Sequence, residues 1–209
     1  MAITSNDASI TGLNIKRENA PVVGVLALQG DFREHIEMLN MLGVASREIR
    51  LPRALCALDA LIIPGGESTT IARLVLQYGF LEPLREFCAS GRPVWGTCAG
   101  AILLARDVDE LDRPGIQAMD IQVQRNAFGR QQQSFQSQVK IDGISDGKFP
   151  AIFIRAPAIT DVDASVEILA SLPDGKIVAA RQRNLLATVF HPELTTDVRL
   201  HNLFLSMID

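Results

Sequence analysis

The sequence predicts a single α/β domain with a central, mostly parallel sheet flanked by helices and with additional antiparallel strands in its C-terminal half. In the first half, apolar runs of strand length alternate with helical patterns, which is typical of βαβ units. In the second half, short strand-like runs are separated by turn-forming pairs such as Asp142-Gly143 and Asp146-Gly147. One strand of the first half, Pro93–Trp95, runs directly into a Gly-x-Cys-x-Gly turn followed by a helical pattern.

Length and composition favour one domain. The 209 residues, 47% of them hydrophobic, suffice for one large core, so a second domain is not required. The segment Met1–Ala20 is polar and lacks the apolar stretch of a signal peptide. We expect residues 1–20 to form a mobile tail, with docking onto a partner as the alternative, and residues 21–209 to form the domain.

Charge and cysteine content exclude several classes of function. The formal net charge is −4, from 20 basic and 24 acidic residues, and no Lys/Arg run suggests nucleic-acid binding. No apolar run approaches the roughly 18 residues that a membrane span needs. Three irregularly spaced cysteines suggest neither a disulfide framework nor a zinc site, and they fit a reducing cytoplasm. No metal or cofactor is predicted.

The elements of the first half follow from hydrophobic patterning. The apolar run 22–28 suits a buried parallel strand, and Asp31 is expected to cap the helix that Gly43 ends. That helix has its apolar positions at Phe32, Ile36, Leu39 and Leu42. Strands are expected at 44–51 and 60–63. Helices are expected at 69–76, with Ser68 or Thr69 as the cap, and at 81–89.

The elements of the second half are mostly short strands bounded by turns. A helical pattern returns only near the C-terminus, at 196–208, and the acidic segment 107–110 is interpreted as a solvated helix end. Trp95, Cys56 and Cys88 are assigned to packing. The expected strands are 121–124, 137–141, 151–154, 166–170, 177–180 and 186–190.

The turn around Cys98 is the first candidate site. With serine at its centre, Gly-x-Cys-x-Gly between a strand and a helix would be a nucleophile elbow, a turn so sharp that its neighbours, Gly96 and Gly100, must be tiny. It places the thiol at a helix N-terminus, where unpaired N–H groups favour an anion such as a thiolate. The alternative is that Cys98 is a small buried residue in a tight turn.

A cysteine nucleophile needs a base, and the base needs an orienting acid. His191 follows a buried-type strand, and Glu193, two residues on, can reach its imidazole across Pro192. The alternative is an ordinary strand-to-helix turn. His35 is assigned to the exposed side of the first helix, and His201 is interpreted as structural or solvated.

The segment Pro64–Ser68 is the third candidate. Its glycine pair at a strand end exposes backbone N–H groups that can hold an oxyanion. The alternative is a plain turn before a capped helix. It is not a phosphate loop, because the Gly-Lys-Ser/Thr ending is missing.

Taken together, these motifs resemble the class I (triad) glutamine amidotransferases. The motifs that carry a narrower resemblance are 26–30 (LALQG), 65–70 (GGESTT), 96–100 (GTCAG), 125–131 (RNAFGRQ), 153–157 (FIRAP) and 191–193 (HPE). With these motifs the chain, from about residue 22 to the C-terminus, is similar to the family of glutaminase subunits of pyridoxal 5′-phosphate synthases.

The resemblance implies that glutamine is hydrolysed to glutamate and ammonia. Cys98 would attack the side-chain amide, His191 would transfer the protons, and Glu193 would orient His191. The N–H groups of Gly66 and Ala99 would form the oxyanion hole. The same resemblance implies that glutamine is bound by Gly66, Glu67, Ser68, Arg125, Ile154 and Arg155.

The resemblance also implies a partner, a (β/α)₈-barrel synthase subunit that receives the ammonia through a channel and makes pyridoxal 5′-phosphate. Gln29, at a strand end near the site, is a candidate for coupling the two subunits, or else is a polar strand terminus.

Three alternatives stay open from the sequence. The chain could serve a different synthase of the same triad class, or it could be a cysteine peptidase or deglycase-like hydrolase on a similar scaffold. It could also be a binding subunit with an inactive site, which the intact Cys98, His191 and Glu193 argue against.

Overall fold

The computed structural model describes residues 20–109, 111–128 and 134–208. Residues 1–19, Glu110, residues 129–133 and Asp209 lie outside the described residues. The predicted tail up to residue 19 and part of the Arg125–Gln131 motif therefore also lie outside them. Within the described part, the helices are α1 (Phe32–Met41), η1 (Pro52–Ala57), α2 (Ser68–Gln77), α3 (Leu81–Ala89), α4 (Ala99–Leu104), η2 (Pro192–Leu194) and α5 (Arg199–Leu205).

The strands of the first half are β1 (Val22–Leu26), β2 (Ala45–Ile49), β3 (Ala60–Ile63), β4 (Val94–Thr97) and β5 (Ala105–Val108). Those of the second half are β6 (Met119–Gln124), β7 (Ser134–Val139), β8 (Phe149–Ile154), β9 (Ala158–Val162), β10 (Glu167–Ser171), β11 (Ile177–Gln182) and β12 (Leu185–Thr188).

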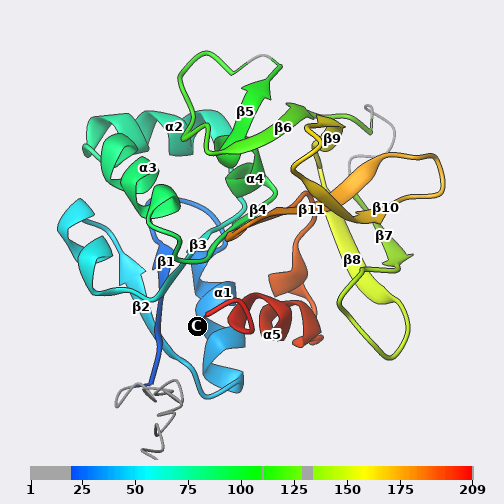
Figure 1. The fold of residues 1–209 in the computed structure, drawn as a ribbon, viewed down its shortest axis with the longest axis horizontal. Coiled ribbons are helices and arrows are strands. Elements are labelled where there is room, and N and C mark those ends of the chain that lie inside the picture. The colour runs from blue at the N-terminus through cyan, green and yellow to red at the C-terminus, as the bar shows by residue number, and fades with distance from the viewer. Residues whose placement is uncertain (1–19, 110, 129–133, 209) are drawn as a thin grey trace, which may run out of the picture.

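Ten of the described strands form one sheet in the order β2-β1-β3-β4-β12-β11-β9-β6-β5, with β10 paired to β11. The pairs from β2 to β12 are parallel, and β11, β9 and β10 add antiparallel pairs. Strands β7 and β8 form a separate antiparallel pair, at the right of Figure 1. The predicted fold class is confirmed.

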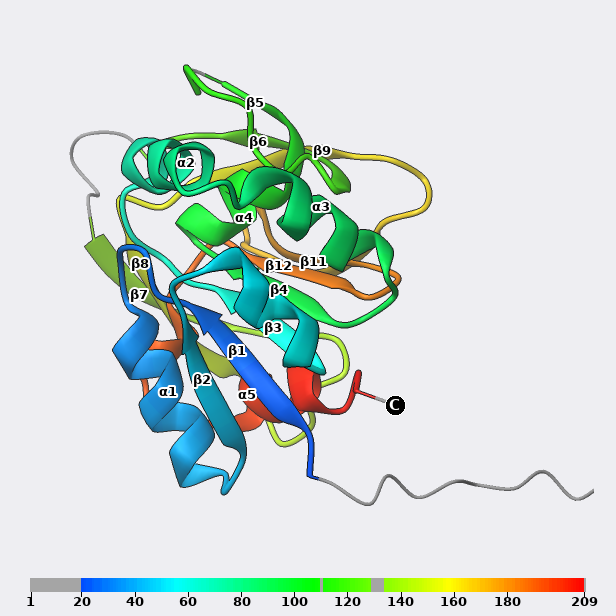
Figure 2. The same ribbon diagram turned by 90° about the vertical axis from the view of Figure 1, so that its left-hand side faces the viewer.

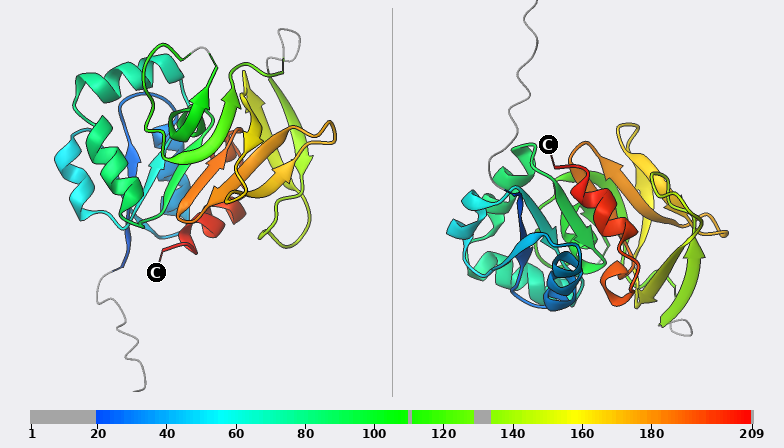
Figure 3. Two further views of the ribbon diagram at one scale, coloured as in Figure 1. Left: turned by 45° about the horizontal axis from the view of Figure 1, so that its top comes forward. Right: turned by 90° about the horizontal axis from the view of Figure 1, so that it is seen from below.

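Helices cover both faces of the parallel strands (Figure 2). Helices α2, α3 and α4 lie on one face, and α1 and α5 lie on the other, side by side in the views of Figures 2 and 3. Because the sheet is covered on both sides, β3, β4 and β12 are buried along their whole length. Strand β8 instead alternates buried and half-buried positions, as expected of a sheet with one face in the core.

Several local predictions are wrong, and tertiary contacts explain why. Residues 105–108, whose acidic end was interpreted as a helix end, form strand β5, because α4 ends at Leu104 and the extended chain pairs with β6. Strand β9 was not expected. Helix α2 is capped by the Glu67 carboxylate rather than by Ser68 or Thr69.

The three cysteines differ in environment. Cys88 is buried in α3, as predicted, and its burial raises the pKa of the thiol to about 12. Cys56, predicted to pack, is exposed, because η1 turns Leu55 inward and leaves the Cys56 thiol donating to the carbonyl of Arg53. In the described part of the chain, no helix is long and apolar enough to cross a membrane.

Candidate active site

A cleft of about 400 Å³ opens where β1, β3, β4 and β12 end. The carboxyl ends of parallel strands meet at one edge of a sheet, so residues that follow these strands converge there. The cleft is lined by Gln29, Gly30, Asp31, Gly66, Glu67, Ser68, Cys98, Ile102, Arg125, Asn126, Ile154, Arg155, Pro157, His191 and Leu194. The structure thus brings together the predicted nucleophile, its base and all six residues predicted to bind glutamine.

Cys98 occupies the sharp turn that the sequence predicts. Its φ of 47° and ψ of −101° lie outside the regions that non-glycine residues ordinarily adopt. A Cβ added at Gly96 would lie 2.5 Å from the carbonyl carbon of Gly100, and one added at Gly100 would lie 1.9 Å from the Ile63 oxygen. The Cys98 N–H donates to Thr188 of β12, which anchors the strained turn to the sheet.

His191 lies just beyond β12 and is nearly buried. Its Nδ1 is 2.7 Å from Oε1 of Glu193, which confirms the predicted reach across Pro192. Burial lowers the pKa of His191, but hydrogen bonds to Asp31, Cys98 and Glu193 outweigh it and raise this pKa to about 12. An imidazolium next to Cys98 stabilises the thiolate.

Asp31 is a second carboxylate at the same imidazole. The sequence predicts it as a helix cap, but its side chain makes no cap hydrogen bond. Instead, its Oδ2 lies 3.2 Å from His191 Nδ1. The sequence signal was its place at the end of β1, the same sheet edge as His191.

The histidine that was assigned to the surface is buried. His35 is 0% exposed, and it contacts His201, Thr97 and Glu193. The predicted inner face of α1 was Phe32, Ile36, Leu39 and Leu42, of which Leu39 is fully buried whereas Phe32 and Ile36 are only partly buried. The inner face is formed by His35, Met38 and Leu39. The His35 imidazole can be buried there because buried polar side chains lie within hydrogen-bonding or ion-pair distance of both ring nitrogens. His201 is also fully buried, so of its two predicted roles, structural or solvated, the structural one holds.

The loop after β3 is fastened by Gln29. The Gln29 Oε1 accepts a hydrogen bond of 2.8 Å from the Glu67 N–H, and a Cβ at Gly66 would lie 2.6 Å from that oxygen. Gly66 has a φ of 152°, which favours glycine. Ala99 begins α4, where first-turn amides have no carbonyl acceptor within the helix. Both amides predicted for the oxyanion hole therefore belong to segments that border the cleft.

Glu67 lines the cleft and also caps helix α2. Its carboxylate accepts hydrogen bonds from the N–H groups of Thr69 (3.0 Å) and Thr70 (2.6 Å), which caps α2. Burial raises the pKa of Glu67, but these hydrogen bonds lower it to about 2. Arg125 lies 3.7 Å from this carboxylate and donates to the Thr69 hydroxyl.

The opposite wall of the cleft comes from the end of β8. Arg155 directly follows Ile154 there with a φ of 43°, and its side chain is exposed. Asn126, with a φ of 50°, also lines this wall and was not predicted. Guanidinium groups at a cleft wall can bind a carboxylate bidentately.

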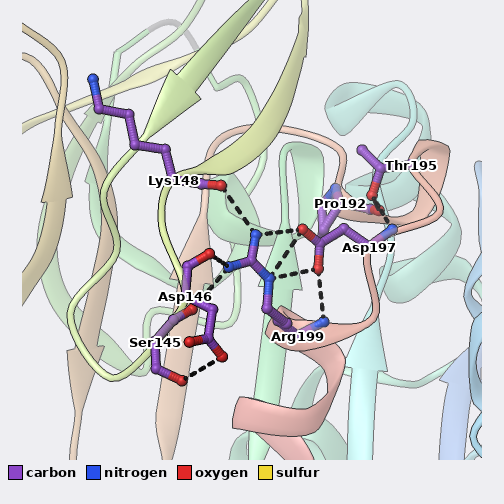
Figure 4. Close-up of polar contacts among 7 residues, drawn as sticks. All are labelled: Ser145, Asp146, Lys148, Pro192, Thr195, Asp197 and Arg199. Atoms are coloured by element: carbon purple, nitrogen blue, oxygen red, sulfur yellow. Dashed lines mark hydrogen bonds and ion pairs between the residues drawn. The ribbon is translucent and has the colours of Figure 1, made fainter.

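The turn that carries His191 and Glu193 is anchored by the segment that follows it (Figure 4). The Thr195 hydroxyl donates to the Pro192 carbonyl and accepts from the Asp197 N–H. The Arg199 guanidinium pairs with Asp197 and donates to the carbonyls of Ser145, Asp146 and Lys148, as Figure 4 shows. These contacts tie the turn to the loop before β8.

Comparison with known proteins identifies the family. The family model of the SNO glutamine amidotransferase family matches residues 25–209. The chain is 54% identical over 188 residues to pyridoxal 5′-phosphate synthase subunit PdxT of Herpetosiphon aurantiacus, covering 88% of this chain and 99% of the relative. It is 53% identical over 186 residues to the PdxT of Moorella thermoacetica, covering 89% and 98%.

Solved structures agree with this match. A crystal structure of a glutamine amidotransferase superposes with a TM-score of 0.84 at 47% identity, covering 89% of this chain and 98% of that one. A putative GMP synthase protein from Thermoplasma acidophilum, at 17% identity and a TM-score of 0.68, covers 92% of this chain and 96% of its own and shares the fold. With its elbow cysteine, paired histidine and glutamate, and family match along most of its length, the chain belongs to the SNO glutamine amidotransferase family.

Proposed function

We propose that the chain is the glutaminase subunit of a pyridoxal 5′-phosphate synthase, in which it hydrolyses L-glutamine to glutamate and ammonia for a partner synthase subunit. The observation that carries the proposal is that Cys98 and His191 line one cleft, with the Glu193 carboxylate 2.7 Å from the His191 imidazole. The names of the relatives that match nearly the whole chain support the assignment to this synthase.

The chemistry follows from the geometry of the site. The Cys98 thiolate adds to the carboxamide carbon of glutamine, and the resulting oxyanion is held by the N–H groups of Gly66 and Ala99. His191 gives its proton to the departing ammonia as the C–N bond breaks, which leaves a thioester on Cys98. Water, deprotonated by His191, then attacks the thioester and releases glutamate and the thiol. Glu193 holds the imidazole in the orientation that these steps need.

Substrate binding is assigned to the two walls of the cleft. Arg125 and Arg155 supply guanidinium groups for the α-carboxylate of glutamine. The half-exposed Glu67, 3.7 Å from Arg125, and the buried Ser68 also line the cleft. Gly66 and Ile154 complete the predicted set.

The ammonia that is released would protonate in bulk water, so the proposal includes a partner that receives it. By family resemblance, this partner is a (β/α)₈-barrel synthase subunit. Gln29 is the proposed coupling residue, because its hydrogen bond to the Glu67 N–H holds the loop that carries Gly66. A partner that moved Gln29 would therefore also move the Gly66 N–H, which is proposed to hold the oxyanion. The cytoplasmic location stays a prediction from the cysteine content.

The experiment is to measure glutamate release from glutamine by the full chain, with and without the synthase subunit. We expect release that rises sharply when the subunit is added, and none from Cys98→Ala. Cys56→Ala, which removes an exposed thiol outside the cleft, is the matched control and should retain turnover.

Two results would contradict the proposal. High release that is indifferent to the synthase subunit would indicate another amidotransferase or a free-standing hydrolase. No release under either condition would indicate a subunit with an inactive site.

A further inference from the structure

A buried polar cluster lies directly behind the proposed triad, and the mechanism above does not use it. It consists of His35 from α1, Thr97 from β4 and His201 from α5, each 0% exposed. Helices α1 and α5 lie side by side on the face of the sheet away from α2 and α3 (Figure 2). The cluster therefore joins two helices to the catalytic turn from the side that substrate does not reach.

The contacts form a chain that ends at Glu193. His201 Nε2 lies 3.1 Å from His35 Nδ1, and His35 Nε2 lies 3.2 Å from the Thr97 hydroxyl. The same His35 Nε2 lies 3.4 Å from Glu193 Oε2. Glu193 uses its other oxygen, Oε1, for His191.

Glu193 Oε2 needs a donor. It is fully buried, and it has no well-formed hydrogen bond among the described residues. Burial raises the pKa of the Glu193 carboxyl, whereas the contact with His191 opposes that change. A buried carboxylate without a donor is unfavourable, so whichever N–H points at Oε2 stabilises the ionised form.

The charge on Glu193 favours one tautomer of each histidine. With the proton on Nε2, the His35 N–H donates to the Thr97 oxygen and presents its positive end to Glu193 Oε2, 3.4 Å from the same nitrogen, and Nδ1 accepts from His201 Nε2–H. With the proton on Nδ1, the Nε2 lone pair of His35 would face the carboxylate, which is repulsive. Burial, with the neighbouring histidines adding to it, lowers the pKa of His35, and burial lowers that of His201 to about 4, so both rings are neutral.

The rings are also held in place sterically. Trp95 packs edge-on against both imidazoles, with centroid distances of 5.6 Å to His35 and 4.9 Å to His201. The direction of the His35 N–H is therefore set by packing as well as by His201.

We propose that His35 is a positioning residue for the glutaminase reaction: its Nε2–H, fixed in that tautomer by His201, holds Glu193 ionised and aligned on His191. The proposal rests on the proposed function, because it assigns a role within the same triad. It extends the triad by two residues: His35 of α1 contacts Glu193, and His201 of α5 contacts His35.

The test compares two amide substitutions at one position. In His35→Gln, the amide nitrogen reaches about the place of Nε2 and can donate to Glu193. In His35→Asn, it reaches only the place of Nδ1, next to His201. Both substitutions keep a polar group in the pocket, so differences in folding are small by design.

The assay is glutamate release by the full chain with excess synthase subunit. We expect His35→Asn to lower kcat about 10- to 100-fold, the range that follows from losing a hydrogen bond to a charged group, with the glutamine KM nearly unchanged. We expect His35→Gln to retain most of the wild-type kcat. Equal kcat values for the two variants, or a change confined to KM, would overturn the proposal.

Two further measurements separate positioning from general damage. Gln182→Leu removes another buried hydrogen-bonding side chain, which binds Asp120 and Ser165 away from the cleft, and should lower the Tm without lowering kcat. An electrophilic glutamine analogue should label Cys98 at the same rate in Glu193→Ala and in the double variant Glu193→Ala/His35→Asn, because the carboxylate that His35 positions is absent from both. Slower labelling of the double variant would overturn the proposal.

Failure of the proposed function would look different. A wild-type chain that releases no glutamate with the synthase subunit would reject the glutaminase assignment itself. An active wild-type chain with an equally active His35→Asn would reject only the role of His35.

Discussion

At the scale of single residues, the site depends on side chains held in demanding positions. Cys98 keeps a positive φ, which for a non-glycine residue costs about 1–3 kcal/mol and persists only where the surroundings impose it. The Cys98 N–H bond to Thr188 and the contact of Gly100 with Ile63 are the constraints that impose it. Arg155 and Asn126, also with positive φ, lie at the same cleft. Three of the six described non-glycine residues with positive φ therefore lie at the cleft where the chemistry is assigned.

The proposed carboxylate contacts give a prediction for the two arginines. Arg125→Ala and Arg155→Ala should each raise the glutamine KM about 10- to 100-fold, since a hydrogen bond to a charged group contributes about 1.5–3 kcal/mol. The kcat should change little. Steady-state kinetics of glutamate release measure both parameters.

Arg106→Ala is the control, because that guanidinium pairs with Asp120 and does not line the cleft. If the two cleft variants lowered kcat and left KM unchanged, the binding role would be wrong.

At the scale of elements, three strands of the parallel sheet each deliver one part of the site. Strand β3 leads to the Gly66 loop, β4 to Cys98 and β12 to His191. Helix α4 packs against β3 and β4 closely enough that only glycine fits at position 100. The capped start of α2 holds Glu67 next to the loop that carries Gly66.

The cap of α2 predicts a pH-dependent contribution to stability. The pKa of Glu67 falls from an ordinary value of 4.5 to about 2 on folding, so the cap stabilises the fold fully above pH 4.5. Its contribution is lost as the pH falls through the folded pKa. Glu67→Ala should destabilise by about 1 kcal/mol or less at pH 7, because solvent screens the half-exposed carboxylate.

Urea unfolding of the wild type and the variant at pH 7, 4 and 2.5 measures this contribution. The difference in the free energy of unfolding between the wild type and Glu67→Ala should decrease toward low pH. Glu82→Ala, which removes an exposed first-turn carboxylate from α3, is the matched control. A difference that stays constant across this range would contradict the capping role of the ionised carboxylate.

At the scale of the whole molecule, one hydrophobic core supports both the sheet and the site. Its buried residues run from Val23 to Phe204 and include the large side chains Trp95, Phe153 and Phe190. The family match begins at residue 25, and the relatives cover 88–89% of the chain. The family match therefore does not include residues 1–19.

This division predicts the effect of a truncation. Deleting residues 2–19 should leave the Tm and the basal glutamate release unchanged, because the described core and cleft begin after them. Thermal unfolding and the glutamate assay measure the two quantities. A lower Tm would contradict the predicted boundary at residues 20–21. A loss confined to turnover with the synthase subunit would favour the alternative that the segment docks onto the partner.

The sequence determined those features that depend on local pattern. The apolar runs of β1, β3 and β12 identified buried parallel strands, and the glycines around Cys98 identified the sharp turn, because only tiny residues fit there. The spacing of His191 and Glu193 was enough to predict their contact, since two residues across a proline-stiffened turn leave little freedom.

The tertiary structure decided what depends on contacts between distant segments. The assignment of His35 to the surface was wrong because His201, 166 positions away, supplies the partner that makes its burial favourable. Asp31 is the N-cap residue of α1, but its carboxylate contacts His191 instead of the first-turn amides. The Glu67 carboxylate caps α2, because those amides lie within its reach. Strand β5 forms where helix α4 ends because β6 lies beside it to accept the pairing. The periodicity of a sequence predicts which face of a helix or strand is apolar. Whether a polar side chain is buried depends on hydrogen-bond partners from distant segments, which only the folded chain brings together.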